Sequence, residues 1–128
     1  MAPASGKTTH TETAKQLARA VNVFVETEII PNEPLLAQQG ERSLRLQSDL
    51  AQKARQAGLR GLFYPLSHGG KIASLEDYLL VAEQEGRTEF SQAIFASHTA
   101  LDAHMLLKFG NAAIHEQFLQ PLASGDAL

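Results

Sequence analysis

Apolar residues recur in this chain at the spacing of one helix face, and Gly or Pro separates the segments that show it. From Thr13 to about Ala37 they stand at these positions: Leu17, Val21, Phe24, Val25 and Ile29. Side chains three or four residues apart share one face of an α-helix, so the spacing predicts a long amphipathic helix. Pro31 lacks an amide proton and disfavours helix at the residue before it, so we expect a kink or break at Ile30.

Two further segments show the same spacing. The first runs from Ser43 to Ala57 and is followed by Gly58, where a left-handed C-terminal cap is expected. The second begins at Ser74, which together with Asp77 forms the pattern of a capping box. We expect one face of this second segment to be buried, made of Leu75, Tyr78, Leu79 and Ala82.

The segment from Phe90 to Phe109 is apolar on all sides, which predicts one central helix. One stripe of it contains Phe90, Ala93, Ile94, Ser97, Leu101, Met105 and Lys108. Gly110 should end this helix, and Asn111 can cap a last one. The last helix should bury Ile114, Phe118 and Leu119. No segment alternates with the period of a strand, so we predict an all-α bundle of about five or six helices.

The composition narrows the classes of function. Charged residues make up 20% of the chain and its formal charge is −3, so no basic face suggests a nucleic acid or a membrane surface. The chain has no cysteine and no apolar run near the length of a membrane span, which is about 20 residues. We expect residues 1–12 to be a mobile tail, residues 13–128 to form one helical domain, and the protein to be cytoplasmic.

Two glycine-containing stretches are weak candidates for anion binding. The tail Ser5–Thr9 imitates the end of a phosphate loop but lacks the motif's earlier glycine. The loop Gly58–Lys71 contains a double glycine followed by a lysine, which a tight turn explains as well as an anion site does. The turn is the preferred interpretation, with Leu62 and Phe63 buried against the bundle.

Other polar pairs have structural explanations. His98 and Asp102 lie four residues apart, so they could form a catalytic dyad, but a hydrogen-bonded structural pair is the simpler interpretation. Glu83 and Glu85 lie two apart and diverge on a helix, which predicts solvated side chains, and the same holds for Glu26 and Glu28. Spacing alone therefore assigns no catalytic, cofactor-binding or metal-binding residue.

The order of several short motifs resembles the N-terminal helical domain of the acyl-CoA dehydrogenase family, over about Leu17 to Leu128. The motifs are Pro31 closing the first helix, Ala57-Gly58-Leu59 with Gly61-Leu62, Pro65 followed by Gly69-Gly70, Ala82-Glu83 before Gly86-Arg87, and Phe109-Gly110 leading to Phe118-Leu119, Pro121-Leu122 and Gly125. The family usually has an acidic residue and an aromatic before the double glycine, where this chain has Ser67 and His68.

The resemblance implies a flavin-dependent oxidoreductase acting on acyl-CoA. In the family, FAD accepts a hydride from Cβ while a glutamate removes a proton from Cα, and both belong mainly to domains that follow this one. The resemblance places Ala93, Ile94, Ser97 and Leu101 against the acyl chain, although the same side chains could simply pack the bundle. This chain alone is expected to bind no cofactor and to be inactive.

Two alternatives remain open at this stage. The chain could be a non-catalytic interaction module that associates with itself through an uncovered apolar face. It could also be one subunit of a split enzyme, completed by a separate flavin-binding chain.

Overall fold

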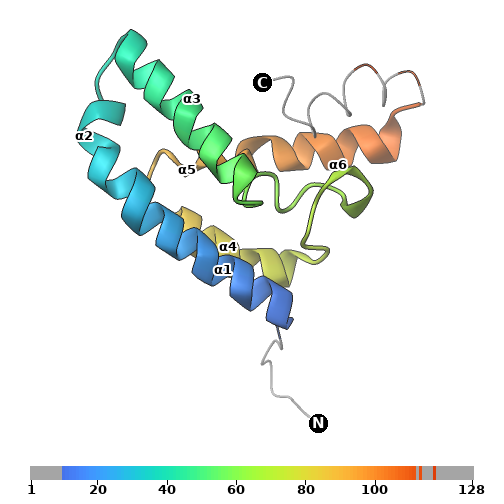
Figure 1. The fold of residues 1–128 in the computed structure, drawn as a ribbon. Coiled ribbons are helices and arrows are strands. Elements are labelled where there is room, and N and C mark those ends of the chain that lie inside the picture. The colour runs from blue at the N-terminus through green and yellow to red at the C-terminus, as the bar shows by residue number, and fades with distance from the viewer. Residues whose placement is uncertain (1–9, 112, 114–116, 118–128) are drawn as a thin grey trace.

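The computed structural model describes residues 10–111, 113 and 117, and within these residues every regular element is a helix. The longer elements, labelled in Figure 1, are α1 (Glu12–Phe24), α2 (Glu33–Leu36), α3 (Glu41–Gln56), α4 (Leu75–Glu85), α5 (Ser91–Phe95) and α6 (Ala100–Phe109). The all-α prediction is confirmed. No helix in this described part is long and apolar enough to cross a membrane.

The first predicted helix is interrupted before its proline, as expected. Regular α-helix ends at Phe24, and the chain continues as a π-helix over Val25–Ile29 and a 3₁₀ turn over Ile30–Asn32. Pro31 has no amide proton to donate to the preceding turn, which favours a change of helix type there. The short helix α2 then leads the chain toward α3.

Helices α1 and α4 lie side by side and run in the same direction (Figure 1). At their beginnings, Thr11 Oγ1 donates to Asp77 Oδ2 at 3.0 Å. At their ends, Arg87 donates to Asn22 and to Glu26. Contacts at both ends fix the relative register of the two helices.

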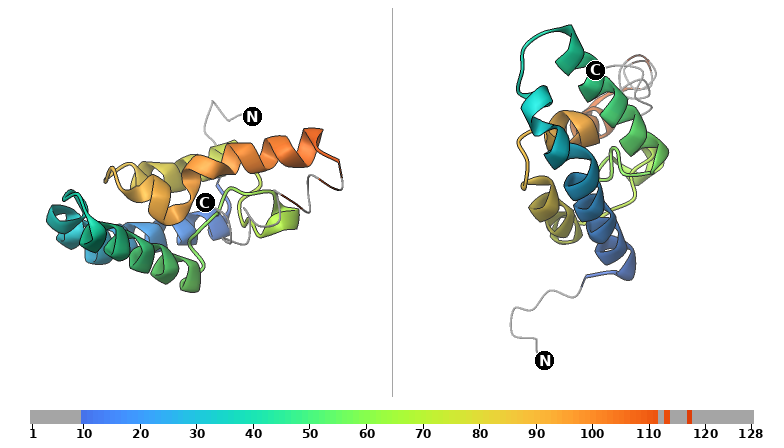
Figure 2. Two further views of the ribbon diagram at one scale, coloured as in Figure 1. Left: turned by 90° about the horizontal axis from the view of Figure 1, so that it is seen from above. Right: turned by 60° about the vertical axis from the view of Figure 1, so that its left-hand side comes forward.

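The apolar core lies between these two helices and the pair α3 and α5. Helices α3 and α5 also pack together, and Figure 2 shows the arrangement of the helices from two further sides. Its most deeply buried large side chains are Val21, Val25, Ile29, Val81, Ile94 and Phe95. The rings of Phe24 and Phe95 meet edge to face, with centroids 5.4 Å apart. This geometry places the electropositive ring edge against the electronegative ring face.

The buried face of α4 differs from the predicted one. Leu75 and Leu79 are each 57% exposed, whereas Val81 and Glu85 are buried. Tyr78 and Ala82 are half-buried. The prediction was wrong for Leu75 and Leu79, because the helix turns Val81 toward α1 and leaves these two side chains on the outside.

The predicted helix from Phe90 to Phe109 is not continuous. Ala96 has a φ of 59°, in the left-handed region, and the chain forms a 3₁₀ turn over Ser97–Thr99 before α6 begins. A left-handed residue changes the direction of the chain and ends the hydrogen-bond ladder of α5. Gly110 ends α6 as predicted. The predicted last helix, with Ile114, Phe118 and Leu119, lies outside the described residues.

The loop from Gly58 to Lys71 is largely buried as far as Pro65 and more exposed after it. Gly58 has a φ of 74°, which confirms the left-handed cap after α3. Leu62 is buried and Phe63 is half-buried, and the Gly61 amide donates to the Phe95 carbonyl at 2.7 Å. A Cβ at Gly70 would overlap the carbonyl group of Tyr64, so only glycine fits there without a shift of the backbone.

Candidate functional site

The four residues predicted to face an acyl chain do not form one stripe. Ala93 and Ile94 lie on α5, Ser97 lies in the 3₁₀ turn, and Leu101 belongs to the first turn of α6. The break at Ala96 separates the first two from the last two, so they do not share the single helix on which the common stripe depended.

Their surroundings differ as well. Ile94 is fully buried in the core, which favours packing as its role. Ala93 is half-buried and lines a pocket of about 230 Å³ with Gln47 and Phe90. Ser97 lines a different pocket of about 460 Å³. The structure describes the backbone of Leu101 but not its side chain.

The larger pocket lies between α4 and the segment that contains α5 and the 3₁₀ turn. We call it the α4–α5 pocket, and its described lining consists of Tyr78, Ala82, Glu85, Gly86, Thr88, Glu89, Ser91, Gln92 and Ser97. Most of these residues are polar. Only residues 86–90 separate the end of α4 from the beginning of α5, so most of the lining comes from one short stretch of the chain.

A tyrosine and a carboxylate form the central contact of this pocket. Tyr78 Oη donates to Glu85 Oε1 at 2.6 Å, across two turns of α4. Burial raises the pKa of Glu85 to about 7, against its ordinary value of 4.5, although the hydrogen bond from Tyr78 acts in the opposite direction. Burial and the nearby Glu85 carboxylate raise the pKa of Tyr78 as well, so its phenol stays protonated.

Two serine hydroxyls beside this contact lack hydrogen bonds. Ser91 is 2% exposed, and its Oγ has no hydrogen-bond partner. Ser97 Oγ is buried too and makes no hydrogen bond of normal geometry, yet it lies close enough to lower the pKa of both Tyr78 and Glu85. Buried hydroxyls normally find a partner, so two without one in a single pocket call for an explanation.

The prediction of a solvated side chain was wrong for Glu85, which is 6% exposed. Glu83 and Glu26 are exposed as predicted, while Glu28 is half-buried and pairs with Lys53 at 2.7 Å. Glu85 follows Tyr78 by seven residues and Val81 by four, and this spacing places it on the face of α4 that is turned inward. That spacing is the signal in the sequence that could have identified it.

The Gly58–Lys71 loop supports the pocket from outside. Lys71 Nζ donates to the Gly58 carbonyl at 2.8 Å, so the amine closes the loop. The Phe63 ring stacks on Tyr78 with centroids 4.7 Å apart, and His104 Nε2 contacts the Phe63 carbonyl at 2.7 Å. The structural interpretation of the loop therefore accounts for its lysine and its aromatic residue.

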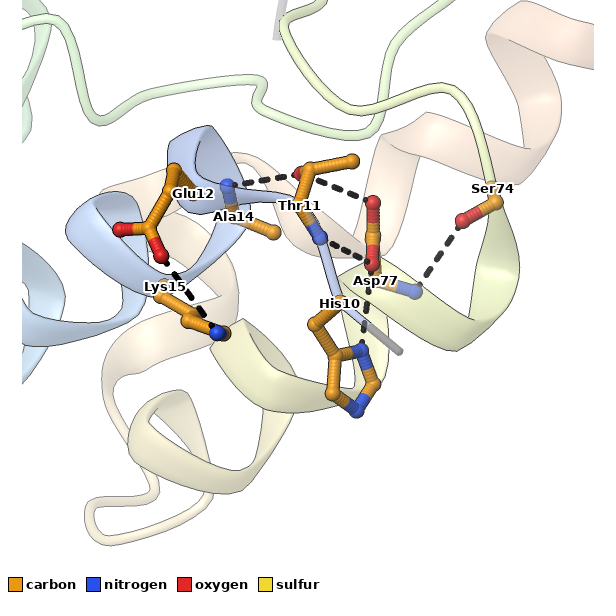
Figure 3. Close-up of polar contacts among 7 residues, drawn as sticks. All are labelled: His10, Thr11, Glu12, Ala14, Lys15, Ser74 and Asp77. Atoms are coloured by element: carbon orange, nitrogen blue, oxygen red, sulfur yellow. Dashed lines mark hydrogen bonds and ion pairs between the residues drawn. The ribbon is translucent and has the colours of Figure 1, made fainter. Parts of the chain in front are cut away.

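A second polar cluster joins the beginnings of α1 and α4 (Figure 3). The Ser74 side chain accepts from the Asp77 amide at 3.2 Å, which confirms the predicted N-cap. The Asp77 carboxylate does not complete the capping box, because it contacts His10 Nδ1 at 3.1 Å and the Thr11 hydroxyl at 3.0 Å. Partial burial acts to raise the pKa of Asp77, but the hydrogen bonds from Thr11 and His10 hold it below its ordinary value. These contacts fasten one helix to the other.

Within the described residues, no group of three or more His, Cys, Asp or Glu side chains is arranged to hold a metal ion. The phosphate-loop-like stretch Ser5–Thr9 lies outside these residues. The proposed pairing of His98 with Asp102 stays a prediction, because the His98 side chain is not described.

The comparisons with known proteins agree on one family. The acyl-CoA dehydrogenase N-terminal domain family matches residues 11–126. A Bacillus subtilis (strain 168) protein named acyl-CoA dehydrogenase is 27% identical over 119 residues, which are 92% of this chain and 30% of that protein. Isovaleryl-CoA dehydrogenase, mitochondrial, of Pongo abelii is 25% identical over 118 residues, which are 90% of this chain and 27% of that protein.

A solved structure from Mycobacterium abscessus, assigned to the acyl-CoA dehydrogenases, matches with a TM-score of 0.73 and 29% identity. The match covers 93% of this chain and 33% of that one. The fold is thus that of an acyl-CoA dehydrogenase N-terminal helical domain. The chain belongs to the acyl-CoA dehydrogenase family, and it spans about a third of the length of the relatives it matches.

Proposed function

We propose that this chain supplies the N-terminal helical wall of the acyl-binding cavity in a flavin-dependent acyl-CoA dehydrogenase. The observation that carries the proposal is the family match over nearly the whole described fold, together with a pocket lined by Ser97. Ala93 borders the neighbouring pocket, which shares Glu89 and Gln92 with the first. The two pockets form adjacent parts of one surface along which an acyl chain can lie. A cytoplasmic location stays a prediction.

In this proposal the four predicted residues have different roles. Ala93 and Ser97 line the surface, while Ile94 supports it from the core. Leu101 stays a predicted contact. The acyl tail gains free energy here by leaving water, in proportion to the apolar area it buries.

The α4–α5 pocket does not fit FAD. Its described lining includes the carboxylates Glu85 and Glu89 and contains no Arg or Lys. A dinucleotide's pyrophosphate is negative and favours helix N-termini or cationic side chains, so carboxylates would repel it. FAD, when bound, would supply the acceptor for hydride, and this chain's residues would bind and orient the substrate.

The substitution Ala93→Phe tests the proposal. In the full-length protein, a phenyl ring at this half-buried position would fill the smaller pocket, so longer acyl chains should lose the most kcat/KM. Acyl-CoA-dependent dye reduction in the presence of FAD, measured for short, medium and long chains, gives the result. Ala37→Phe is the matched control, because Ala37 is exposed at the end of α2. An unchanged chain-length profile in Ala93→Phe would remove Ala93 from the cavity.

A partner-binding role is the second candidate, and exposed apolar side chains favour it. Leu75 and Leu79 on α4 and Met105 and Phe109 on α6 are all more than half exposed. Such side chains are typical of surfaces that another domain, a separate flavin-binding subunit or a second copy covers. Light scattering of this chain across a wide concentration range should show self-association. A constant monomer mass would argue against the module that associates with itself.

A further inference from the structure

The α4–α5 pocket holds more hydrogen-bonding groups than its own residues satisfy. Tyr78 and Glu85 form one hydrogen bond, while the buried Ser91 hydroxyl has no partner. The Ser97 hydroxyl lies beside both Tyr78 and Glu85 but makes no hydrogen bond of normal geometry. An unsatisfied buried hydroxyl is unfavourable, so we expect a ligand or water to complete its hydrogen bonds.

An apolar methyl terminus would leave these groups unsatisfied. A hydroxyl, in contrast, both donates and accepts, so it could donate to Glu85 and accept from Ser97 at the same time. A site built around a substrate hydroxyl discriminates against the analogue that lacks it, because the analogue leaves the buried polar groups without hydrogen-bond partners. The polar lining should therefore favour an acyl chain that carries a hydroxyl over an unsubstituted one.

At a pH above about 7, where Glu85 is ionised, the charge of the pocket disfavours a carboxylate in the same place. Glu85 and Glu89 line it, and no cation stands among the described lining residues. A second carboxylate would meet like charge in a partly desolvated site, which is unfavourable. A neutral group that can donate a hydrogen bond to Glu85 fits better.

We propose that the α4–α5 pocket binds a hydroxyl group carried on the distal part of the acyl chain. This inference rests on the proposed function, because it assumes that an acyl chain reaches the pocket. Ser97 and Glu85 are the residues that recognise the hydroxyl, and Tyr78 holds the Glu85 carboxylate in place. The ring of Tyr78 is itself fixed by the Phe63 ring stacked on it.

The test compares matched ligands on the full-length protein. Butanoyl-CoA, octanoyl-CoA and dodecanoyl-CoA are titrated by calorimetry, each with and without a hydroxyl at the distal carbon. For at least one chain length, the hydroxylated ligand should bind about tenfold more tightly, the effect of one satisfied hydrogen bond in a buried site. Ser97→Ala should abolish the preference, so that both members of each ligand pair bind with equal affinity. Ser48→Ala, at an exposed position on α3, should keep it.

Tyr78→Phe provides a second variant, because it keeps the ring that stacks on Phe63 and removes only the hydroxyl group. It should reduce the preference as well, and circular dichroism should show native helix content in both variants. Equal affinity for the two ligands at every chain length, together with measurable binding, would overturn this inference and leave the proposed function intact. Failure of every acyl-CoA to bind would overturn both. A preference that survives in Ser97→Ala and Tyr78→Phe would also overturn the inference.

Discussion

The core and the α4–α5 pocket both include residues of α5, but the core buries apolar side chains and the pocket buries polar ones. In the core, Val25, Ile29 and Phe95 are apolar side chains that leave at most 1% of their surface exposed. In the pocket, Ser91 and Glu85 are almost as deeply buried and are polar. The first arrangement gains free energy from burial, while the second loses part of it to desolvation.

This difference indicates where selection acts on something other than stability. Proteins break the rules of packing mainly at functional sites, and the rest of the fold compensates. In this domain the compensation comes from the apolar core, to which α5 contributes Ile94 and Phe95. Weakening the core should therefore affect folding, and changing the pocket should affect pH dependence and binding.

Removing a core ring should have the largest effect. Phe95→Ala deletes the ring that meets Phe24 and leaves a cavity, which should lower the free energy of unfolding by about 3–5 kcal/mol. Urea denaturation followed by circular dichroism measures the change. Phe109→Ala is the control, because Phe109 is 71% exposed, and it should change stability by less than about 0.5 kcal/mol. Equal effects at the two positions would contradict the description of the core.

The next largest effect concerns pH. The folded pKa of Glu85 is raised to about 7 from 4.5, so the native state binds this proton more tightly than the unfolded chain does. The contribution of Glu85 to stability is therefore fully present below pH 4.5 and falls as the pH rises toward 7, by about 3 kcal/mol in all.

Glu85→Gln should remove this dependence. The difference in unfolding free energy between variant and wild type should grow across the same pH window, in the direction that favours the variant at higher pH. Glu83→Gln is the control, since Glu83 is exposed on the same helix. A difference between wild type and Glu85→Gln that stays constant with pH would show that Glu85 has the same pKa in the folded and unfolded states.

Two buried serines give a smaller and more selective contrast. Ser43 Oγ donates to the Leu36 carbonyl at 2.8 Å, whereas Ser91 Oγ has no partner. Ser43→Ala should destabilise the protein by about 1 kcal/mol, and Ser91→Ala should stabilise it by about 1 kcal/mol. Thermal unfolding of both variants under one condition measures the contrast. Destabilisation by Ser91→Ala would mean that its hydroxyl has a bonding partner in solution.

The smallest effect is expected on the outer face of α4. Leu79→Gln exchanges an exposed apolar side chain for a polar one and should change the stability of this chain by less than about 0.5 kcal/mol. If light scattering detects self-association, the same variant should weaken it. A large loss of stability in the monomer would show that Leu79 is buried after all.

The fold could be predicted where the signal is local. Gly58 marks a left-handed residue, Ser74 supplies a side-chain cap, and Pro31 removes a donor, and each acts through its own turn of chain. The break at Ala96 could not be predicted, because neither Gly nor Pro stands there and alanine is the strongest helix former. Tertiary packing determines that conformation.

The α4–α5 pocket could not be predicted from the sequence for a related reason. Glu85 resembles any charged residue on a helix surface, and its burial depends on how α4 is rotated against α1. The family resemblance predicts a site role for Ser97, whereas helix spacing predicts only an apolar face for Tyr78 and says nothing of its hydroxyl. The contact between Tyr78 and Glu85 appears only when the inward face of α4 is known.

The left-handed backbone at Ala96 has a consequence for hydrogen exchange. The series of backbone hydrogen bonds stops at Ala96. Helices α5 and α6 therefore need not open together, although they follow one another along the chain. The amides of α5 are held by the core, so their deuterium uptake should report global unfolding. Those of α6, whose Met105 and Phe109 side chains face solvent, should exchange through smaller openings. Two segments predicted as one helix would then differ in protection by orders of magnitude.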